Sequence, residues 1–172
     1  MIKAIIKEEY LAGSQIQTER ELASIHQVGR PAIREVLQRL SHGGWVTLRK
    51  GQPAIVNDYL NEGNVTTIVD IVQHFDEIPD ALVLYFLEMR IAITPYYVKM
   101  AVMLQHPKVV ALLSQMDELT DCKEGFALYD WKMQKELARL SENPIFLLTL
   151  NSFDPAYVKL AMKYFSMSFC RK

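Results

Sequence analysis

The sequence predicts a mainly α-helical protein built from two domains, on three observations. Apolar residues recur at spacings of three and four along most of the 172 residues, which is the period of an amphipathic helix. A pair of short alternating stretches, typical of strands, occurs between residues 45 and 56. A polar stretch at residues 57–63 then separates this N-terminal part from a longer part in which the apolar pattern is helical throughout.

The composition is that of an ordinary globular protein, because about half of the residues are apolar and can form a core. Residues 1–58 hold 8 Lys or Arg against 6 Asp or Glu, so a mild positive balance lies in a chain whose net charge is −1. The start lacks a signal-peptide layout, and uninterrupted apolar runs stay short of the roughly 18 residues of a membrane span. The two cysteines, Cys122 and Cys170, lack metal-ligand spacing. We therefore expect a cytoplasmic protein without membrane contact.

The first elements are two short helices joined by a connector. Apolar spacing predicts a helix over residues 2–10 that ends near Gly13. Thr18 is placed to cap a second helix, Glu19–His26, and Glu21 would complete a capping box. The side chains expected to face inward from this second helix are Leu22, Ala23 and Ile25.

A turn at residues 27–29 leads into a third helix, from about Arg30 to Ser41. Gly29 is expected to give the turn its backbone freedom, and Pro31 suits the first helical turn. The residues expected to be buried are Ile33, Val36, Leu37 and Leu40. Another face carries Arg30, Arg34 and Gln38 at a spacing of four, flanked by Arg39.

Two short strands follow the third helix after a Gly-Gly stop. Residues 45–48 and 54–56 alternate as strands, with Lys50 and Gly51 in the basic turn between them. Helix, turn, helix and basic hairpin in this order form the plan of a winged helix-turn-helix, whose second helix can enter a DNA major groove. We place this domain at residues 1–58.

The second domain, residues 62–172, is predicted to be all-α, a helical bundle. Helices are expected over residues 65–75, 81–93, 96–104, 106–119, 125–140, 145–150 and 154–165. Thr94-Pro95 is expected to break or kink the helical pattern, because a proline disfavours helical backbone at the residue before it. The aromatic and Met side chains of this domain form either an ordinary core or a pocket for a long apolar ligand. Arg90, among apolar neighbours, requires a partner if buried, either an acid within the domain or a ligand headgroup.

Several sequence blocks resemble the GntR family of bacterial transcription regulators and, within it, the FadR subgroup of fatty-acid-responsive regulators. The blocks are Glu19–Ala23, Val28–Arg30, Ile33–Leu40 and Gly44–Thr47, followed by Lys50–Pro53, Met89–Arg90, Ser141 with Asn143–Ile145, and Tyr157 with Tyr164–Phe165. The resemblance extends over nearly the whole chain. It implies a homodimer in the bacterial cytoplasm, associated with the nucleoid, that binds a palindromic DNA operator and is released by long-chain acyl-CoA.

The resemblance also implies which residues bind. The DNA-contacting positions are Arg20, Gly29, Arg30, Pro31, Ala32, Arg34, Lys50 and Gly51, and the ligand-binding positions are Arg90, Tyr157 and Tyr164. The family usually carries hydroxyl side chains where this chain has Gly29, Pro31 and Ala32, so weaker or altered phosphate contacts are expected. Lys50 stands where the subgroup has histidine. The subgroup's C-terminal domain extends further than the matching part of this chain, so an incomplete effector domain is expected.

Metal binding and catalysis are not expected. Many members of the family bind a metal through an Asp-x-x-x-His step, which here is Asp130 followed by Gln134, and a glutamine amide is a poor transition-metal ligand. The sequence has no nucleophile elbow, phosphate loop or dinucleotide fingerprint, so neither an enzyme nor a cofactor is indicated. Two alternatives remain open. One is a regulator of this family that senses another small molecule or none; the other is a helical protein-interaction module whose basic helix face is solvated.

Overall fold

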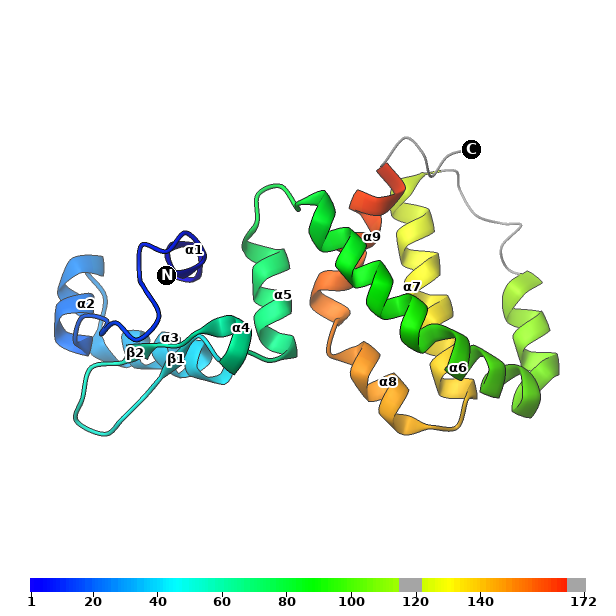
Figure 1. Ribbon diagram of the computed structural model, residues 1–172, viewed down its shortest axis with the longest axis horizontal. Helices are drawn as coiled ribbons and strands as arrows, with labels where there is room; N and C mark the ends of the chain where they lie inside the picture. The colour runs from blue at the N-terminus through cyan, green and yellow to red at the C-terminus, as the bar shows by residue number, and fades with distance from the viewer. Residues whose placement is uncertain (115–121, 167–172) are drawn as a thin grey trace. The chain divides into compact units, whose positions relative to one another are not determined.

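The computed structural model of the chain describes residues 1–114 and 122–166 and is mainly α-helical, as predicted (Figure 1). It divides into two units, Met1–Phe75 and Asp76–Lys172. The predicted helix end near Leu119 and the thiol of Cys170 lie outside the described residues.

The first unit contains a helix-turn-helix followed by a hairpin, in the predicted order (Figure 1). Its elements are α1 (Ile2–Ile6), α2 (Glu19–His26), α3 (Arg30–His42), β1 (Val46–Thr47), β2 (Ile55–Val56), α4 (Tyr59–Glu62) and α5 (Val65–His74). The two strands are antiparallel, with Val46 opposite Val56. Gln15 adds one bridge to Ile55, so the connector before α2 runs along the hairpin.

The start of α2 forms as predicted, whereas the turn after it differs. The hydroxyl oxygen of Thr18 accepts from the backbone N–H of Glu21 (3.3 Å), and the Glu21 carboxylate accepts from the backbone N–H of Thr18 (2.8 Å). Gln27, rather than Gly29, has left-handed backbone (φ 53°), because it is the residue that ends α2. Gly29 caps α3 with extended backbone (φ −70°, ψ 147°), a conformation that other residues also adopt.

The core of the first unit draws on every element from α1 to β2. The buried residues are Ile5, Ile16, Leu22, Ile33, Leu37, Leu40, Trp45, Val46, Ala54 and Val56. Two predictions of burial were wrong: Ile25 is 62% exposed and Val36 is 47% exposed. Helical periodicity marks a broad apolar stripe, but the partner elements cover only the middle of that stripe on α2 and α3.

Helix α5 belongs to the first unit, although the sequence analysis places residues 65–75 in the second domain. The indole N–H of Trp45 donates to a carboxylate oxygen of Asp70 (2.7 Å), and the Thr67 hydroxyl donates to the carbonyl oxygen of Gly43 (2.5 Å). Buried donors need acceptors, so these bonds hold α5 against the end of α3. The division between the units therefore falls after Phe75.

Replacing Gly44 by alanine is expected to lower the free energy of unfolding by about 2 kcal/mol. Gly44 has a φ of +73°, and an added Cβ would lie 2.8 Å from the carbonyl oxygen of Glu62. Gly13→Ala is the matched control, because Gly13 has a φ of +81° with open space around its Cβ position. Urea unfolding of both variants separates the close approach from the backbone cost of about 1 kcal/mol. Equal losses in the two variants would contradict the close approach at Gly44.

The second unit is a helical bundle arranged around α7. Its elements are α6 (Asp80–Leu113), α7 (Lys123–Leu140), α8 (Pro144–Asn151) and α9 (Asp154–Ser166), and α7 contacts each of the other three (Figure 1). The Tyr157 ring stacks on Trp131 with centroids 3.9 Å apart and meets Phe86 edge-on at 5.7 Å. These aromatic contacts join α6, α7 and α9 in one core.

Helix α6 continues through Thr94-Pro95, so the predicted break at this position was wrong. The non-helical residue is Gln105 (φ −138°, ψ 36°), just before His106-Pro107. Pro95 lies on an exposed side of α6, and so does Ile91, whose carbonyl oxygen loses its helical donor at Pro95. In the described part of the chain, α6 is long and apolar enough to cross a membrane by length and composition. One such helix is only weak evidence for a membrane span.

Candidate functional site

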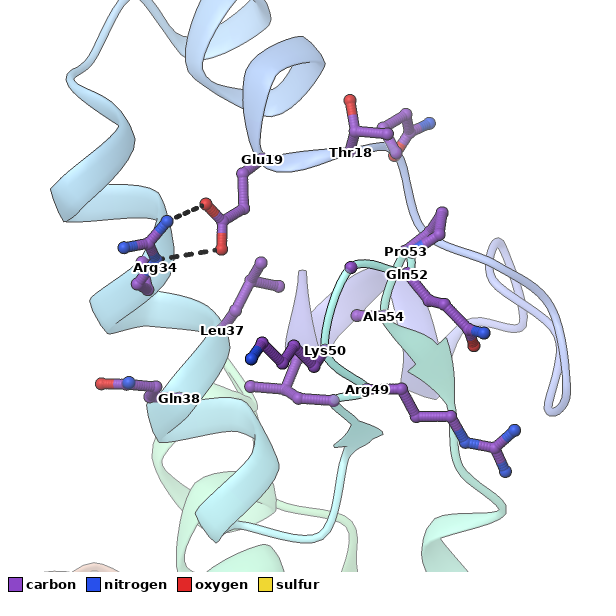
Figure 2. A pocket seen from close by; sticks show the side chains of 13 residues that line it. Thr18, Glu19, Arg34, Leu37, Gln38, Arg49, Lys50, Gln52, Pro53 and Ala54 are labelled. Atoms are coloured by element: carbon purple, nitrogen blue, oxygen red, sulfur yellow. Dashed lines mark hydrogen bonds and ion pairs between the residues drawn. The ribbon is translucent and has the colours of Figure 1, made fainter.

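A groove of about 660 Å³ lies between α3 and the loop that joins β1 to β2 (Figure 2). Its lining comprises residues 17–19, Arg34, Leu37, Gln38 and residues 48–54. Of the predicted DNA contacts, the groove brings together Arg34, Lys50 and Gly51. Figure 2 shows Lys50 extending toward α3 and Arg49 extending away from it. The groove thus carries basic side chains on both of its walls.

The other predicted DNA contacts lie at the starts of α2 and α3, outside the lining of the groove. Arg20 is in the first turn of α2, and Arg30 is the first residue of α3. Gly29, Pro31 and Ala32 surround the start of α3, and all five residues are exposed. A helix start presents backbone N–H groups that favour anions, so each of these arginines stands where a phosphate would be favoured.

The absence of a hydroxyl at Gly29 is not imposed by crowding. A Cβ added there would meet Pro31 Cδ at 3.5 Å, an ordinary contact. A serine or threonine at this position would therefore fit, and its oxygen could cap α3, which lacks a side-chain cap at Gly29.

Arg34 is paired with an acid that the sequence analysis did not single out. Its Nε–H donates to Oε1 of Glu19 (3.2 Å) and its Nη2–H donates to Oε2 (2.8 Å) (Figure 2). The hydrogen bonds from Arg34 hold the pKa of Glu19 below its usual range. The two residues are 15 apart in the chain, on different helices, so helical spacing gives no signal of the pair.

The second candidate site surrounds Arg90 in the helical unit. Its Nη1 and Nη2 donate to the two carboxylate oxygens of Asp130, at 2.9 and 3.1 Å. The Tyr157 hydroxyl donates to the same carboxylate (2.6 Å). Burial, followed by the nearby negative charge of Asp130, raises the pKa of Tyr157. Arg90 therefore has the acidic partner within the domain that one of the two predicted arrangements required.

The Asp-x-x-x-Gln step belongs to the same buried network. The Gln134 amide donates to Asp130 Oδ1 (3.3 Å), and the Tyr97 hydroxyl donates to the Gln134 carbonyl oxygen. The Asp130 carboxylate thus accepts from Arg90, Tyr157 and Gln134 together. Within residues 1–114 and 122–166, no group of three His, Cys, Asp or Glu side chains could hold a metal ion.

A cleft of about 610 Å³ lies beside this network. Its lining is Leu87, Arg90, Ile91, Thr94, Pro95, Val98, Asp130, Tyr164 and Phe165. The cleft brings together two of the predicted ligand-binding residues, Arg90 and Tyr164. Tyr157 is buried instead, with its ring centroid 5.6 Å from the guanidinium carbon of Arg90. The walls are largely apolar, and the one cation among them, Arg90, is paired with Asp130, which also lines the cleft.

Comparison with known protein families accounts for both units. Residues 1–56 match the family described as bacterial regulatory proteins, gntR family, and residues 57–172 match the FadR C-terminal domain. Together the two matches span the chain.

Named relatives extend the similarity over the full length. A fatty acid metabolism regulator protein of Shewanella pealeana is 31% identical over 175 residues, covering 99% of this chain and 72% of the relative. A protein of the same name from Shewanella sp. (strain MR-7) is 32% identical over 172 residues, covering 100% and 71%. Among solved structures, a GntR protein of Streptococcus agalactiae is similar at 21% identity and a TM-score of 0.38, covering 96% of this chain and 78% of that one.

Proposed function

The chain belongs to the GntR family of bacterial transcription regulators and has a FadR-type C-terminal domain, and from this premise we propose that long-chain acyl-CoA releases it from its DNA operator. Its relatives are named as regulators of fatty acid metabolism, and this chain is a regulator of the same kind. The sensing of acyl-CoA, the dimer and the operator are the parts that this proposal adds.

The distribution of cations on the first unit is the main support for the proposed binding to DNA. Arg20 and Arg30 are exposed at helix starts, and Arg34 and Lys50 line the groove between α3 and the hairpin loop. Long cationic side chains neutralise phosphates and make paired hydrogen bonds to guanine edges. Residues in these positions support docking of α3 in a major groove, with the tip at Gly51 against the neighbouring backbone.

We infer a homodimer because each DNA-binding unit has a single recognition helix. One recognition helix contacts only a half-site, so a palindromic operator and a two-fold pair of chains reinforce one another. Ligand binding that changes the packing of the helical unit would change the spacing of the two DNA-binding units. The affinity for the operator would change with that spacing.

The cleft at Arg90 supports an acyl ligand. Its volume of about 610 Å³ lies within the range of small-molecule sites, and its walls at Leu87, Ile91 and Val98 are apolar. Arg90 lines the cleft together with its partner Asp130, so an anionic headgroup would compete with that carboxylate for the guanidinium N–H groups.

Oleoyl-CoA added to the protein–DNA complex is expected to lower the apparent DNA affinity by about 5- to 150-fold, the usual size of coupling between two sites. Fluorescence anisotropy of a labelled duplex, selected by the protein from a random pool, measures the release. Free CoA and oleate serve as controls, because each carries only one half of the ligand.

Two other outcomes would replace the proposal. A complex that forms but ignores oleoyl-CoA would indicate a regulator that senses another molecule or none. If the protein binds no duplex at low salt, the helical protein-interaction module becomes the better description. Isothermal titration of the protein alone with oleoyl-CoA separates loss of ligand binding from loss of coupling.

A further inference from the structure

The ion pair between Glu19 and Arg34 joins α2 and α3, the two helices of the helix-turn-helix. Glu19 is the first residue of α2, and Arg34 lies one turn into α3. Both side chains line the groove between α3 and the hairpin loop. The acid therefore lies within the surface that would face DNA, close to an arginine expected to contact it.

Glu19 occupies only some of the N–H donors of the Arg34 guanidinium group and leaves the others free to bind. Arginine has five N–H donors in a planar fork. Glu19 accepts from Nε and Nη2, which form one side edge of that fork, at 3.2 and 2.8 Å. The end of the fork, formed by Nη1 and the second N–H of Nη2, points away from the carboxylate. Two parallel donors at that end match the O6 and N7 acceptors of guanine.

The pair contributes little to folding, so its position calls for another role. The Arg34 and Glu19 side chains are 63% and 37% exposed. Ion pairs between exposed side chains contribute little to stability. The start of α2 is already capped by Thr18 and Glu21. A carboxylate in a DNA-facing groove also repels phosphates, which is a cost for a protein that only needs to bind the DNA backbone.

We propose that Glu19 is a positioning residue that holds Arg34 for a guanine edge and keeps it from phosphates. The inference rests on the proposed DNA-binding function and adds to it the source of base discrimination. Fixing the side edge of Arg34 removes rotamers that would reach the DNA backbone, and the negative charge of Glu19 offsets the unspecific attraction of the groove.

The chain offers a matched control on the same helix. Arg39 donates through Nη2 to Oε1 of Glu35 (2.6 Å), and both side chains are exposed. This pair does not line the groove, and its partners are four residues apart within α3. Glu35→Gln therefore makes the same change of charge without affecting Arg34.

The test is selection from a random 20-base-pair duplex pool by the 172-residue chain and its variants, followed by sequencing. Arg34→Ala identifies the base pair at which Arg34 discriminates. Glu19→Gln is expected to lose about tenfold of the preference at that same base pair, as expected when one bidentate contact is impaired. Glu35→Gln is expected to retain the wild-type preference. Affinity for the unselected pool at two KCl concentrations is expected to rise in Glu19→Gln, with a steeper salt dependence.

These readouts separate positioning from folding. A general loss of structure would weaken binding to every sequence and lower the melting temperature, whereas the proposal requires a change at one base pair. Glu19→Asp, which keeps the charge but shortens the reach, is a second variant and is expected to lose the preference as well.

Two results would overturn the inference, and a third would go further. Glu19→Gln could select the same sequences as the wild type with equal discrimination, or Arg34→Ala could leave every base preference unchanged. If the wild type selects no sequence and binds no duplex, the proposed function itself fails, and the role of Glu19 fails with it.

Discussion

The double variant Arg20→Ala/Arg30→Ala is expected to bind duplex DNA at least roughly 30-fold more weakly than the wild type. Each arginine lies in the first turn of a helix, where its charge adds to the backbone N–H groups that favour phosphate. We expect each arginine to reach a base edge as well as a phosphate, and one direct base contact contributes about 1–3 kcal/mol. Fluorescence anisotropy with a duplex selected by the wild type, at 50 and 200 mM KCl, measures the loss and the change in salt slope.

The control for this variant is Arg39→Ala/Arg139→Ala, which changes the net charge equally. Arg39 and Arg139 are exposed and paired with nearby acids, and neither lines the groove. An equal loss of affinity in both double variants would show that total charge, rather than placement at the helix starts, determines binding. An unchanged affinity of Arg20→Ala/Arg30→Ala would refute the proposed interface.

Asp130→Ala is expected to lower the free energy of unfolding of the helical unit by about 3–5 kcal/mol. The variant leaves the charge of Arg90, whose side chain is 22% exposed, without the carboxylate that accepts two of its N–H groups. It also removes the acceptor of the Tyr157 hydroxyl, which is buried. Urea unfolding followed by tryptophan fluorescence reports this loss, because Trp131 stacks on Tyr157.

Tyr157→Phe is the companion variant, since it removes a single hydroxyl from the same network. It is expected to cost about 1.5–3 kcal/mol, the range of one hydrogen bond to a charged group. The larger loss in Asp130→Ala would then be due to the unpaired arginine. If both variants unfold at the same urea concentration, Arg90 does not depend on Asp130 for its stability.

Local chemistry was the part of the fold most accessible from sequence. Thr18 with Glu21 marks the start of α2 because a capping box depends on residues three apart. The break at Pro95 was mispredicted because a proline at the exposed side of a long helix loses one hydrogen bond, while neighbouring turns and tertiary contacts sustain the helix. The burial of Ile25 and Val36 was mispredicted for a related reason, since it depends on how wide a partner covers each helix.

The residues of the candidate sites also fall into two groups, those that local sequence predicts and those whose partners depend on tertiary packing. Cations at helix starts, such as Arg30, follow from a motif in which each residue has a fixed place. The partners of Arg34 and Arg90 lie 15 and 40 residues away, so they depend on how α2 meets α3 and how α6 meets α7. Helical periodicity reveals only contacts between residues three or four apart on one helix. Both pairs join different helices, so tertiary packing alone brings these charges together.

The hydrogen bond from Trp45 to Asp70 determines how short a self-sufficient DNA reader can be. The match to the gntR family ends at residue 56, which leaves Asp70 outside. Trp45 has no exposed surface, so a fragment cut there would uncover a large aromatic ring and leave its indole N–H without the carboxylate. A fragment that extends to Phe75 keeps both the acceptor and the apolar cover of Ile71. The smallest excisable module of this regulator therefore crosses the boundary between its two family signatures.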